Sequence, residues 1–152
     1  MRADMSSGSV ILRCPSCRTL NRVPVDRLSG HPVCGSCKAA LRFPSAPINA
    51  AAATFDREVN DWPGPLLVEF WGRNCGYCRM VEPVVNDIAS WRAGMLKVLK
   101  VDVETETALS RRFDVMATPT FILLHNGRQV ARIDGAPQEK LDLVRWVDQH
   151  LP

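Results

Sequence analysis

The sequence predicts an α/β domain, with a mixed central sheet covered by helices, that follows a small cysteine-rich module. From residue 54 onward, short apolar runs of strand length alternate with helical patterns. Four of the six cysteines lie before residue 38 in two Cys-x-x-Cys pairs, and the third pair stands apart at positions 75 and 78. The 152 residues suffice for one medium domain and an appendage, and a hydrophobic content of 46% allows a packed core.

The first two cysteine pairs predict a zinc-ribbon-like module over residues 1–43. Cys14 and Cys17 are separated from Cys34 and Cys37 by sixteen residues, a spacing typical of a four-cysteine zinc site. Each pair places two sulfurs on one side of a turn, and two turns complete a tetrahedron. So short a segment cannot bury a sufficient core, so we expect one structural Zn²⁺ to stabilise it. Two disulfides or a second redox centre are the alternatives.

The charge of the chain is uneven. Residues 1–46 carry seven Lys/Arg and two Asp/Glu, a net charge of +5, whereas residues 47–152 carry twelve and fourteen, a net charge of −2. A basic segment can indicate nucleic-acid binding. A divalent metal held by four thiolates would add −2 and leave the module near +3, so a nucleic-acid partner is not expected.

Two prolines followed by small residues predict a linker over 44–53, before a domain over 54–152. Residues 54–60 predict a short helix with Thr54 as its N-cap. The nearly continuous apolar run over 66–70 predicts a strand that is buried on both faces.

A longer helix is predicted over 76–91, and Pro83 inside it should kink it. Further along, Asn126-Gly127 supplies the positive φ of a tight hairpin turn. The apolar positions at helical spacing in the long helix are Met80, Val84, Val85, Ile88 and Trp91, and those in the last helix are Leu141, Val144, Trp146 and Val147. We expect further strands over 95–101, 120–124 and 128–133, and further helices over 105–112 and 138–151.

Cys75 and Cys78 fall between the buried strand and the long helix, which favours redox chemistry. The thiolate is the reactive form of cysteine, and the start of a helix supplies unpaired N–H groups and the positive end of the helix dipole. We expect Cys75 to be exposed and to attack, and Cys78, one turn into the helix, to resolve. Gly76 allows a substrate chain to approach closely. Half of a metal site or inert core thiols are the alternatives, but the sequence offers no further ligand nearby.

One stretch resembles the active-site segment of the thioredoxin family: residues 70–80, FWGRNCGYCRM. The resemblance extends from about residue 54 to residue 151, where Thr118-Pro119-Thr120 is similar to the cis-proline segment of the family. Together with the four N-terminal cysteines, it resembles the zinc-binding cytoplasmic branch of bacterial thioredoxins. The resemblance implies the thioredoxin fold and reduction of protein disulfides.

The resemblance also implies roles for individual residues. A cis Pro119 leaves the backbone of Thr118 free to pair with an extended substrate. Glu69 either faces solvent or is a buried base of raised pKa that accepts a proton from Cys78, with Lys100 as its charge partner. The expected catalytic residues are Cys75, Cys78, Glu69, Lys100 and Pro119, and the expected substrate contacts are Trp71, Gly76, Tyr77 and Thr118.

Three residues depart from the family pattern: Asn74, Tyr77 and Glu69 stand where Trp, Pro and Asp are usual. Unlike proline, Tyr77 has a backbone N–H, and it lies in the first turn of the helix. We therefore expect the Tyr77 amide to donate to the Cys75 sulfur and to make the pair less reducing.

The expected partners are disulfide-containing proteins and an NADPH-dependent thioredoxin reductase. No run approaches the ~18 apolar residues needed to cross a membrane, and the N-terminus lacks the pattern of a secretory signal. We therefore expect a cytoplasmic protein without a membrane partner. Two other functions are kept as alternatives: a zinc-ribbon protein-binding module on a thioredoxin-like scaffold, and a more oxidising, isomerase-like role.

Overall fold

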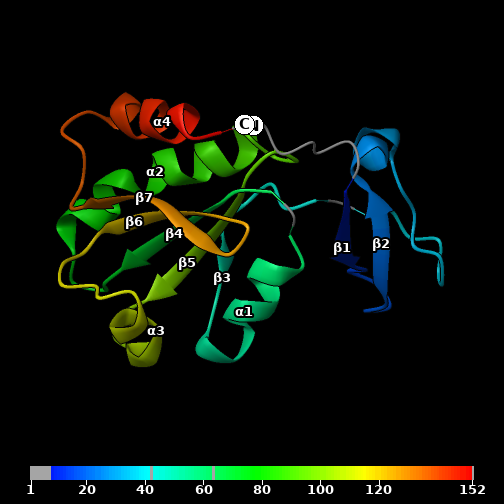
Figure 1. The fold of residues 1–152 in the computed structure, drawn as a ribbon, viewed down its shortest axis with the longest axis horizontal. Helices are drawn as coiled ribbons and strands as arrows, with labels where there is room; N and C mark the ends of the chain where they lie inside the picture. The colour runs from blue at the N-terminus through cyan, green and yellow to red at the C-terminus, as the bar shows by residue number, and fades with distance from the viewer. Residues whose placement is uncertain (1–7, 42, 63, 152) are drawn as a thin grey trace.

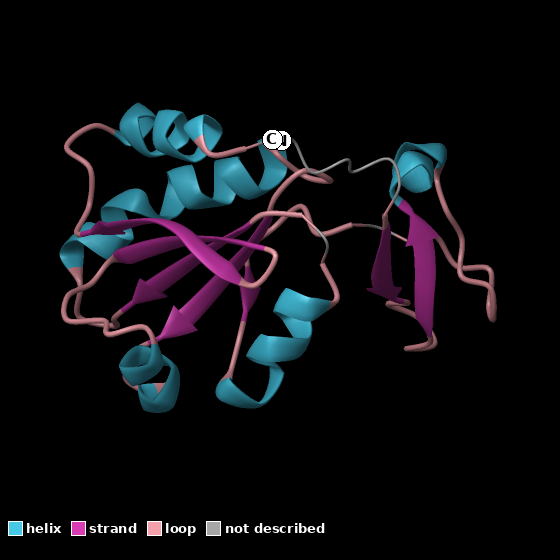
Figure 2. Cartoon of the chain, in the orientation of Figure 1, coloured by secondary structure: helices cyan, strands magenta, loops and turns pink. Residues whose placement is uncertain are grey.

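The computed structural model describes residues 8–41, 43–62 and 64–151. Its elements form a small N-terminal hairpin and a five-stranded sheet covered by helices (Figures 1 and 2). In the described part of the chain, no helix combines the length and the apolar character that a membrane crossing requires. The residues that lie outside the description, although the expected module and domain include them, are 1–7, Arg42, Pro63 and Pro152.

The hairpin pairs β1 (Ser9–Arg13) with β2 (Leu20–Pro24) in antiparallel fashion and leads into a 3₁₀ helix, η2 (Val25–Gly30). The Ile11 amide donates to the Asp61 carbonyl at 3.2 Å, so the hairpin is hydrogen-bonded to the residue that follows helix α1 (Ala52–Asn60). The buried residues of this region belong to the same apolar cluster as one face of the large sheet: Val10, Leu12, Val23, Leu28 and Leu41.

The large sheet has the strand order β3-β5-β4-β6-β7. β3 (Ile48–Asn49), β5 (Lys97–Asp102) and β4 (Leu66–Trp71) run parallel, whereas β6 (Thr120–His125) and β7 (Arg128–Asp134) continue it in antiparallel fashion. β4 lies at the centre, and all its residues except the last are buried, as the apolar run predicted.

Helices cover both faces of the sheet (Figure 1). α2 (Gly76–Trp91) and α4 (Lys140–Gln149) pack on one face, and α1 (Ala52–Asn60) and α3 (Thr107–Arg112) pack on the other. Successive side chains of a strand alternate between the two faces. In β4, Leu66, Val68 and Phe70 join the α1 and α3 side, whereas Leu67 joins the α2 and α4 side, and Glu69 follows Leu67 on this alternation.

The start of the domain differs from the prediction. The segment expected as a linker over 44–53 contains β3 and the beginning of α1. Thr54 is not the N-cap: Ala51 occupies that position, and Thr54 Oγ1 accepts a hydrogen bond from the Ala51 amide at 3.2 Å. Alanine has the highest helix propensity, so the alanines before Thr54 extend the helix toward the N-terminus.

The helix faces also differ in part. α2 has the predicted bounds, but Met80 and Trp91 are 60% and 55% exposed. In α4, Leu141 is 55% exposed. The buried stripes follow the i, i+3, i+4 and i+7 spacing, and the three exposed residues lie outside them. The buried residues are Cys78, Val81, Val84, Val85, Ile88 and Ala89 in α2, and Leu143 and Val147 in α4.

Candidate active site and metal centre

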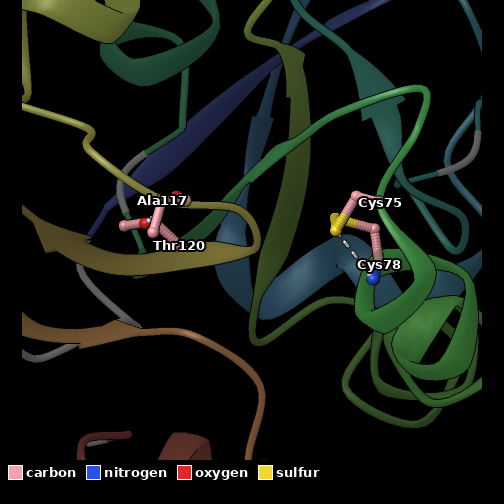
Figure 3. The surroundings of a disulfide bond; sticks show 4 residues. All are labelled: Cys75, Cys78, Ala117 and Thr120. Carbon is pink, nitrogen blue, oxygen red and sulfur yellow. Dashed lines mark hydrogen bonds between the residues drawn. A yellow bond between two sulfur atoms is a disulfide. The ribbon is translucent and has the colours of Figure 1, made fainter.

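The third cysteine pair is joined in a disulfide where α2 begins (Figure 3). Cys75 is the N-cap of the helix, and the Cys78 amide donates to Cys75 Sγ at 3.1 Å. An N–H of the first helical turn is thus directed at the sulfur, which favours a thiolate there. Cys75 is half-buried and therefore less exposed than expected, but it is more accessible than Cys78, whose exposure is 6%.

In the disulfide form, the amide that donates to Cys75 is not the Tyr77 amide expected for the reduced protein. Within the described residues, the hydrogen bond to Cys75 Sγ comes from Cys78 and not from Tyr77. A residue at the N-cap accepts from either of two amides of the first turn, and the geometry here selects the second of them. The Tyr77 side chain projects outward and is 64% exposed.

A loop that ends at β6 faces the disulfide (Figure 3). The Thr118–Pro119 peptide bond in it is cis, as the resemblance implied. The Pro119 carbonyl accepts from the Gly135 amide, and Thr120 Oγ1 donates to the Ala117 carbonyl, both at 2.7 Å. These bonds hold the loop on both sides of Thr118, whose own backbone has no hydrogen bond to any described residue.

Glu69 is 1% exposed, so the interpretation that it faces solvent was wrong. Its Oε1 has no hydrogen-bond partner among the described residues. Loss of solvent on burial raises the pKa of Glu69 to about 7; the positive charge of Lys100 opposes this rise and the negative charge of Glu82 adds to it. A cavity of about 120 Å³ joins these groups, and its lining includes Glu69, Trp71, Cys78, Glu82 and Lys100.

Lys100 is the direct neighbour of Glu69 in the register of β4 and β5. Its ion pair is nevertheless with Glu82, at 3.9 Å between Nζ and Oε1, and its Nζ lies 5.1 Å from the centre of the Trp71 ring. Lys100 thus acts on Glu69 through its charge and not through a direct ion pair. Glu82 was not among the site residues expected from the sequence, although its position four residues after Cys78 places both on one helix face.

The four N-terminal cysteines come together as the spacing predicted, with all four Sγ atoms within 4.8 Å of one another. Cys14 Sγ and Cys37 Sγ are 3.5 Å apart, and Cys17 Sγ and Cys34 Sγ are 3.6 Å apart. A tetrahedral Zn²⁺ with Zn–S bonds of ~2.3 Å needs sulfurs about 3.8 Å apart. Both the donor set and the geometry therefore fit this metal.

The two cysteine turns repeat one geometry. The amides of Ser16 and Ser36 donate to Cys14 Sγ and Cys34 Sγ, both at 3.4 Å. The turns close at Arg18 and Lys38, which have φ values of 68° and 67°. Amides directed at sulfur favour the thiolate, which is the form that binds metal.

Asn21 connects the two cysteine turns, and no sequence motif marks it as part of the site. Its Nδ2 lies 3.5 Å from Cys34 Sγ and also donates to the Thr19 carbonyl at 3.1 Å. Its Oδ1 accepts from the Gly35 amide at 2.9 Å. Groups that orient the ligands in this way tune a metal site from outside its coordination shell.

Comparison with known proteins gives matches to both parts of the chain. The family model described as Thioredoxin matches residues 46–149, and the model described as Thioredoxin 2, N-terminal, a zinc ribbon, matches residues 13–39. Thioredoxin C-3 of Corynebacterium nephridii is 36% identical over 142 residues, which cover 93% of this chain and 96% of the relative.

Two further matches cover mainly the larger domain. The bifunctional thioredoxin reductase/thioredoxin of Mycobacterium leprae is 40% identical over 105 residues, which are 69% of this chain and 23% of the relative. The crystal structure of a thioredoxin from Nicotiana alata superposes with a TM-score of 0.64 at 29% identity, over 72% of this chain and 96% of that one.

Proposed function

The chain belongs to the thioredoxin family, and on that basis we propose which of its residues carry out the reduction of protein disulfides. The chain is a protein-disulfide reductase that works by thiol–disulfide exchange. One observation supports the assignment of Cys75 and Cys78 as the reacting pair and of Glu69 as the base. Cys75 and Cys78 form a disulfide at the start of α2, and Cys78 lines the cavity that also contains Glu69.

The first step belongs to Cys75. In the reduced protein its thiolate attacks one sulfur of the substrate disulfide. A bond forms between Cys75 Sγ and that sulfur, while the other substrate sulfur leaves as a thiolate and takes a proton from water. The Cys78 amide, 3.1 Å from Cys75 Sγ, stabilises the negative charge before the attack.

The second step releases the product. Cys78 gives its proton to Glu69 and attacks Cys75 Sγ, so that the second substrate sulfur leaves as a thiolate. The protein is oxidised by two electrons, and the substrate is reduced by two. A pKa of about 7 suits Glu69 to accept a proton near neutral pH, and a cavity of about 120 Å³ has room for water between carboxylate and thiol. Lys100 keeps part of the Glu69 population ionised.

Substrate binding is assigned to the surface around the disulfide. The free backbone of Thr118, held in place by cis Pro119, pairs with an extended substrate segment. Gly76 is exposed, and apart from its chain neighbours and the backbone of its own helix no described atom lies within 4 Å of the position a Cβ would take, so a substrate chain approaches without hindrance. We assign aromatic contacts with the substrate to Trp71, which is half-buried, and to Tyr77, which is exposed.

The N-terminal module, over residues 1–43, holds one structural Zn²⁺ through Cys14, Cys17, Cys34 and Cys37. The match to a zinc ribbon model and the closeness of the four sulfurs support this. The segment 44–53 connects the module to the domain over 54–152 and also contributes β3 to its sheet. The metal acts on stability and not on disulfide exchange, because its four ligands are all protein sulfurs.

The electrons come from an NADPH-dependent thioredoxin reductase, and the site of action is the cytoplasm. The Mycobacterium leprae relative, named as both reductase and thioredoxin, supports the first assignment. Four metal-binding thiols and a catalytic dithiol both need a reducing compartment, which supports the second.

The division of labour is tested with two variants. We expect Cys75→Ser to abolish reduction of protein disulfides, and Cys78→Ser to accumulate mixed disulfides because nothing resolves them. Mass spectrometry of the trapped species measures both. Trapping by Cys75→Ser in place of Cys78→Ser would reverse the two roles.

A further inference from the structure

Arg132, a residue of the edge strand β7, reaches the start of the loop that faces the disulfide. It lies opposite Ile122 in the register of β6 and β7, and Ile122 belongs to the apolar cluster on the α1 and α3 side. Side chains directly opposite each other in an antiparallel pair point to the same face of the sheet. The guanidinium of Arg132 is therefore on the side of the sheet where α3 ends and the loop begins.

The Arg132 side chain holds the end of α3 with two hydrogen bonds. Its Nη1 and Nη2 groups donate to the carbonyls of Phe113 and Asp114, the second bond at 2.8 Å. The last carbonyls of a helix have no partners within it and form the negative end of its dipole, so a cation that donates to them is stabilising. Asp114 has a φ of 53°, a conformation that a residue other than glycine keeps when its surroundings fix it.

The same side chain is connected to the other end of the loop. Arg132 Nε donates to Asp134 Oδ1 at 3.0 Å, and Thr120 Oγ1 lies 3.4 Å from the same oxygen. Thr120 Oγ1 in turn donates to the Ala117 carbonyl at 2.7 Å. The side chains of Arg132, Asp134 and Thr120 thus form one network, which contacts the loop over residues 115–119 at both of its ends.

The middle of the loop does not hold itself in place. Among the described residues, the amides of Met116, Ala117 and Thr118 donate to no backbone carbonyl, and Met116 is 85% exposed. The position of Thr118 is therefore set by what holds the ends of the loop. Arg132 is suited to this task, since its side chain is only 22% exposed and a guanidinium is a planar group whose donors have fixed directions.

We propose that Arg132 is a positioning residue for the reduction of protein disulfides. By joining the end of α3 to β7, it keeps the backbone of Thr118 where an extended substrate segment pairs with it. The inference rests on the role proposed for Thr118 in substrate binding. Arg132 lies outside the lining of the cavity that contains Glu69 and Cys78, so it acts on the binding of polypeptides and not on the exchange of thiols.

The test compares the full-length native protein with Arg132→Met, which keeps an unbranched side chain and removes every donor. With insulin as the substrate, we expect KM to rise about tenfold with little change in kcat, as when the substrate loses the equivalent of one hydrogen bond. Hydroxyethyl disulfide is too small to pair with the Thr118 backbone. We therefore expect both proteins to reduce it at the same rate.

Two further variants and one spectroscopic measurement locate the effect. Arg132→Lys keeps the charge but loses the planar fork, so its KM for insulin should be intermediate. Arg128→Met is the matched control, because Arg128 is exposed at the start of the same strand; it should keep the native KM. In a mixed disulfide between a peptide and the Cys78→Ser protein, the Thr118 amide should be protected from hydrogen exchange. Adding Arg132→Met should remove this protection.

Three results would overturn the proposal: a native KM for insulin in Arg132→Met, an equal loss of activity toward hydroxyethyl disulfide, or an equal rise of KM in Arg128→Met. If Arg132→Met does not fold, Arg132→Lys decides, since a rise in KM for insulin alone supports the proposal and a native KM overturns it. Failure of the native protein to reduce both insulin and hydroxyethyl disulfide would overturn the proposed function instead.

Discussion

At the scale of single residues, burial of the Glu69 carboxylate has the clearest consequence for the mechanism. Its carboxylate is buried and one of its oxygens has no hydrogen-bond partner among the described residues, so the charged form is costly. Burial raises its pKa from 4.5 to about 7, although Lys100 opposes the rise. Between these two values the folded protein holds a proton that the unfolded chain has released. The free energy of unfolding must therefore fall as pH rises through this window.

Replacing Glu69 with Gln removes that titration. We expect Glu69→Gln to match the native protein in stability near pH 4 and to exceed it at pH 8, by up to about 3 kcal/mol, as a raised pKa predicts. Urea unfolding of the oxidised proteins across this pH range measures the difference. The same variant should slow the resolution step by Cys78. A constant stability difference at all pH values would show that Glu69 does not titrate in this window.

Glu82 also lines the cavity that contains Glu69, and it contributes a negative charge there. It pairs with Lys100, and its negative charge raises the pKa of Glu69. We expect Glu82→Gln to lower the Glu69 pKa, because Lys100 then acts on Glu69 without an opposing charge. Carbon-13 NMR titration of the Glu69 carboxyl group measures this. Asp87→Asn, an exposed change on the same helix and outside the cavity lining, should leave the titration in place; equal shifts in both variants would contradict the role of Glu82.

At the scale of elements, α2 and α4 are placed by narrow apolar stripes against one face of the sheet. The sequence pattern predicted both helices, but it assigned Leu141 to the apolar face of α4. The structure buries Leu143 completely and leaves Leu141 at 55% exposure. The register of a stripe depends on which residue meets the sheet, and a difference of two positions rotates a helix face by about 200°.

This assignment is tested by truncating each leucine. We expect Leu143→Ala to destabilise the protein by about 2–5 kcal/mol, because it leaves a cavity in the core. Leu141→Ala should change the free energy of unfolding by less than about 0.5 kcal/mol, since the side chain is exposed. Chemical denaturation measures both. Similar effects of the two substitutions would show that α4 is rotated about its axis.

At the scale of the whole molecule, the chain joins two parts that gain stability in different ways. The large domain buries both faces of its central strand under helices. The N-terminal hairpin has one apolar side, and its two turns bring four cysteine sulfurs together. We expect a metal bound by these sulfurs to stabilise the turns. The two parts contact each other through the Ile11–Asp61 hydrogen bond and through the shared apolar cluster.

Removing the metal should separate these two contributions. We expect the purified, reduced protein to contain one Zn²⁺ per chain. After chelation, the amides of β1 and β2 should lose protection from hydrogen exchange, while those of β4 keep it. Reduction of disulfides by Cys75 and Cys78 should persist, because the sheet does not need the metal to fold. Equal loss of protection in β4 would mean that the two parts fold as one unit.

Short-range signals account for most of what could be predicted. The bounds of α2 follow from the apolar run before Cys75 and the stripe after it, and the Asn126–Gly127 turn adopts positive φ values of 54° and 75°. β3 was not predicted because it has only two residues and lies in a segment rich in proline and alanine. It forms a strand because it pairs with β5. A two-residue strand has no periodicity to detect.

The sequence by itself determined the chemistry that is local in the chain: the cysteine turns of the metal site, the dithiol at the start of a helix, and the central buried strand. Spacing, turn residues and hydrophobic period act over a few residues, so they can be read without the fold. Only the tertiary structure decided what surrounds Glu69, that Lys100 pairs with Glu82, and that Arg132 reaches the end of α3. These depend on side chains from separate elements, whose distances are set by the packing of the sheet and its helices.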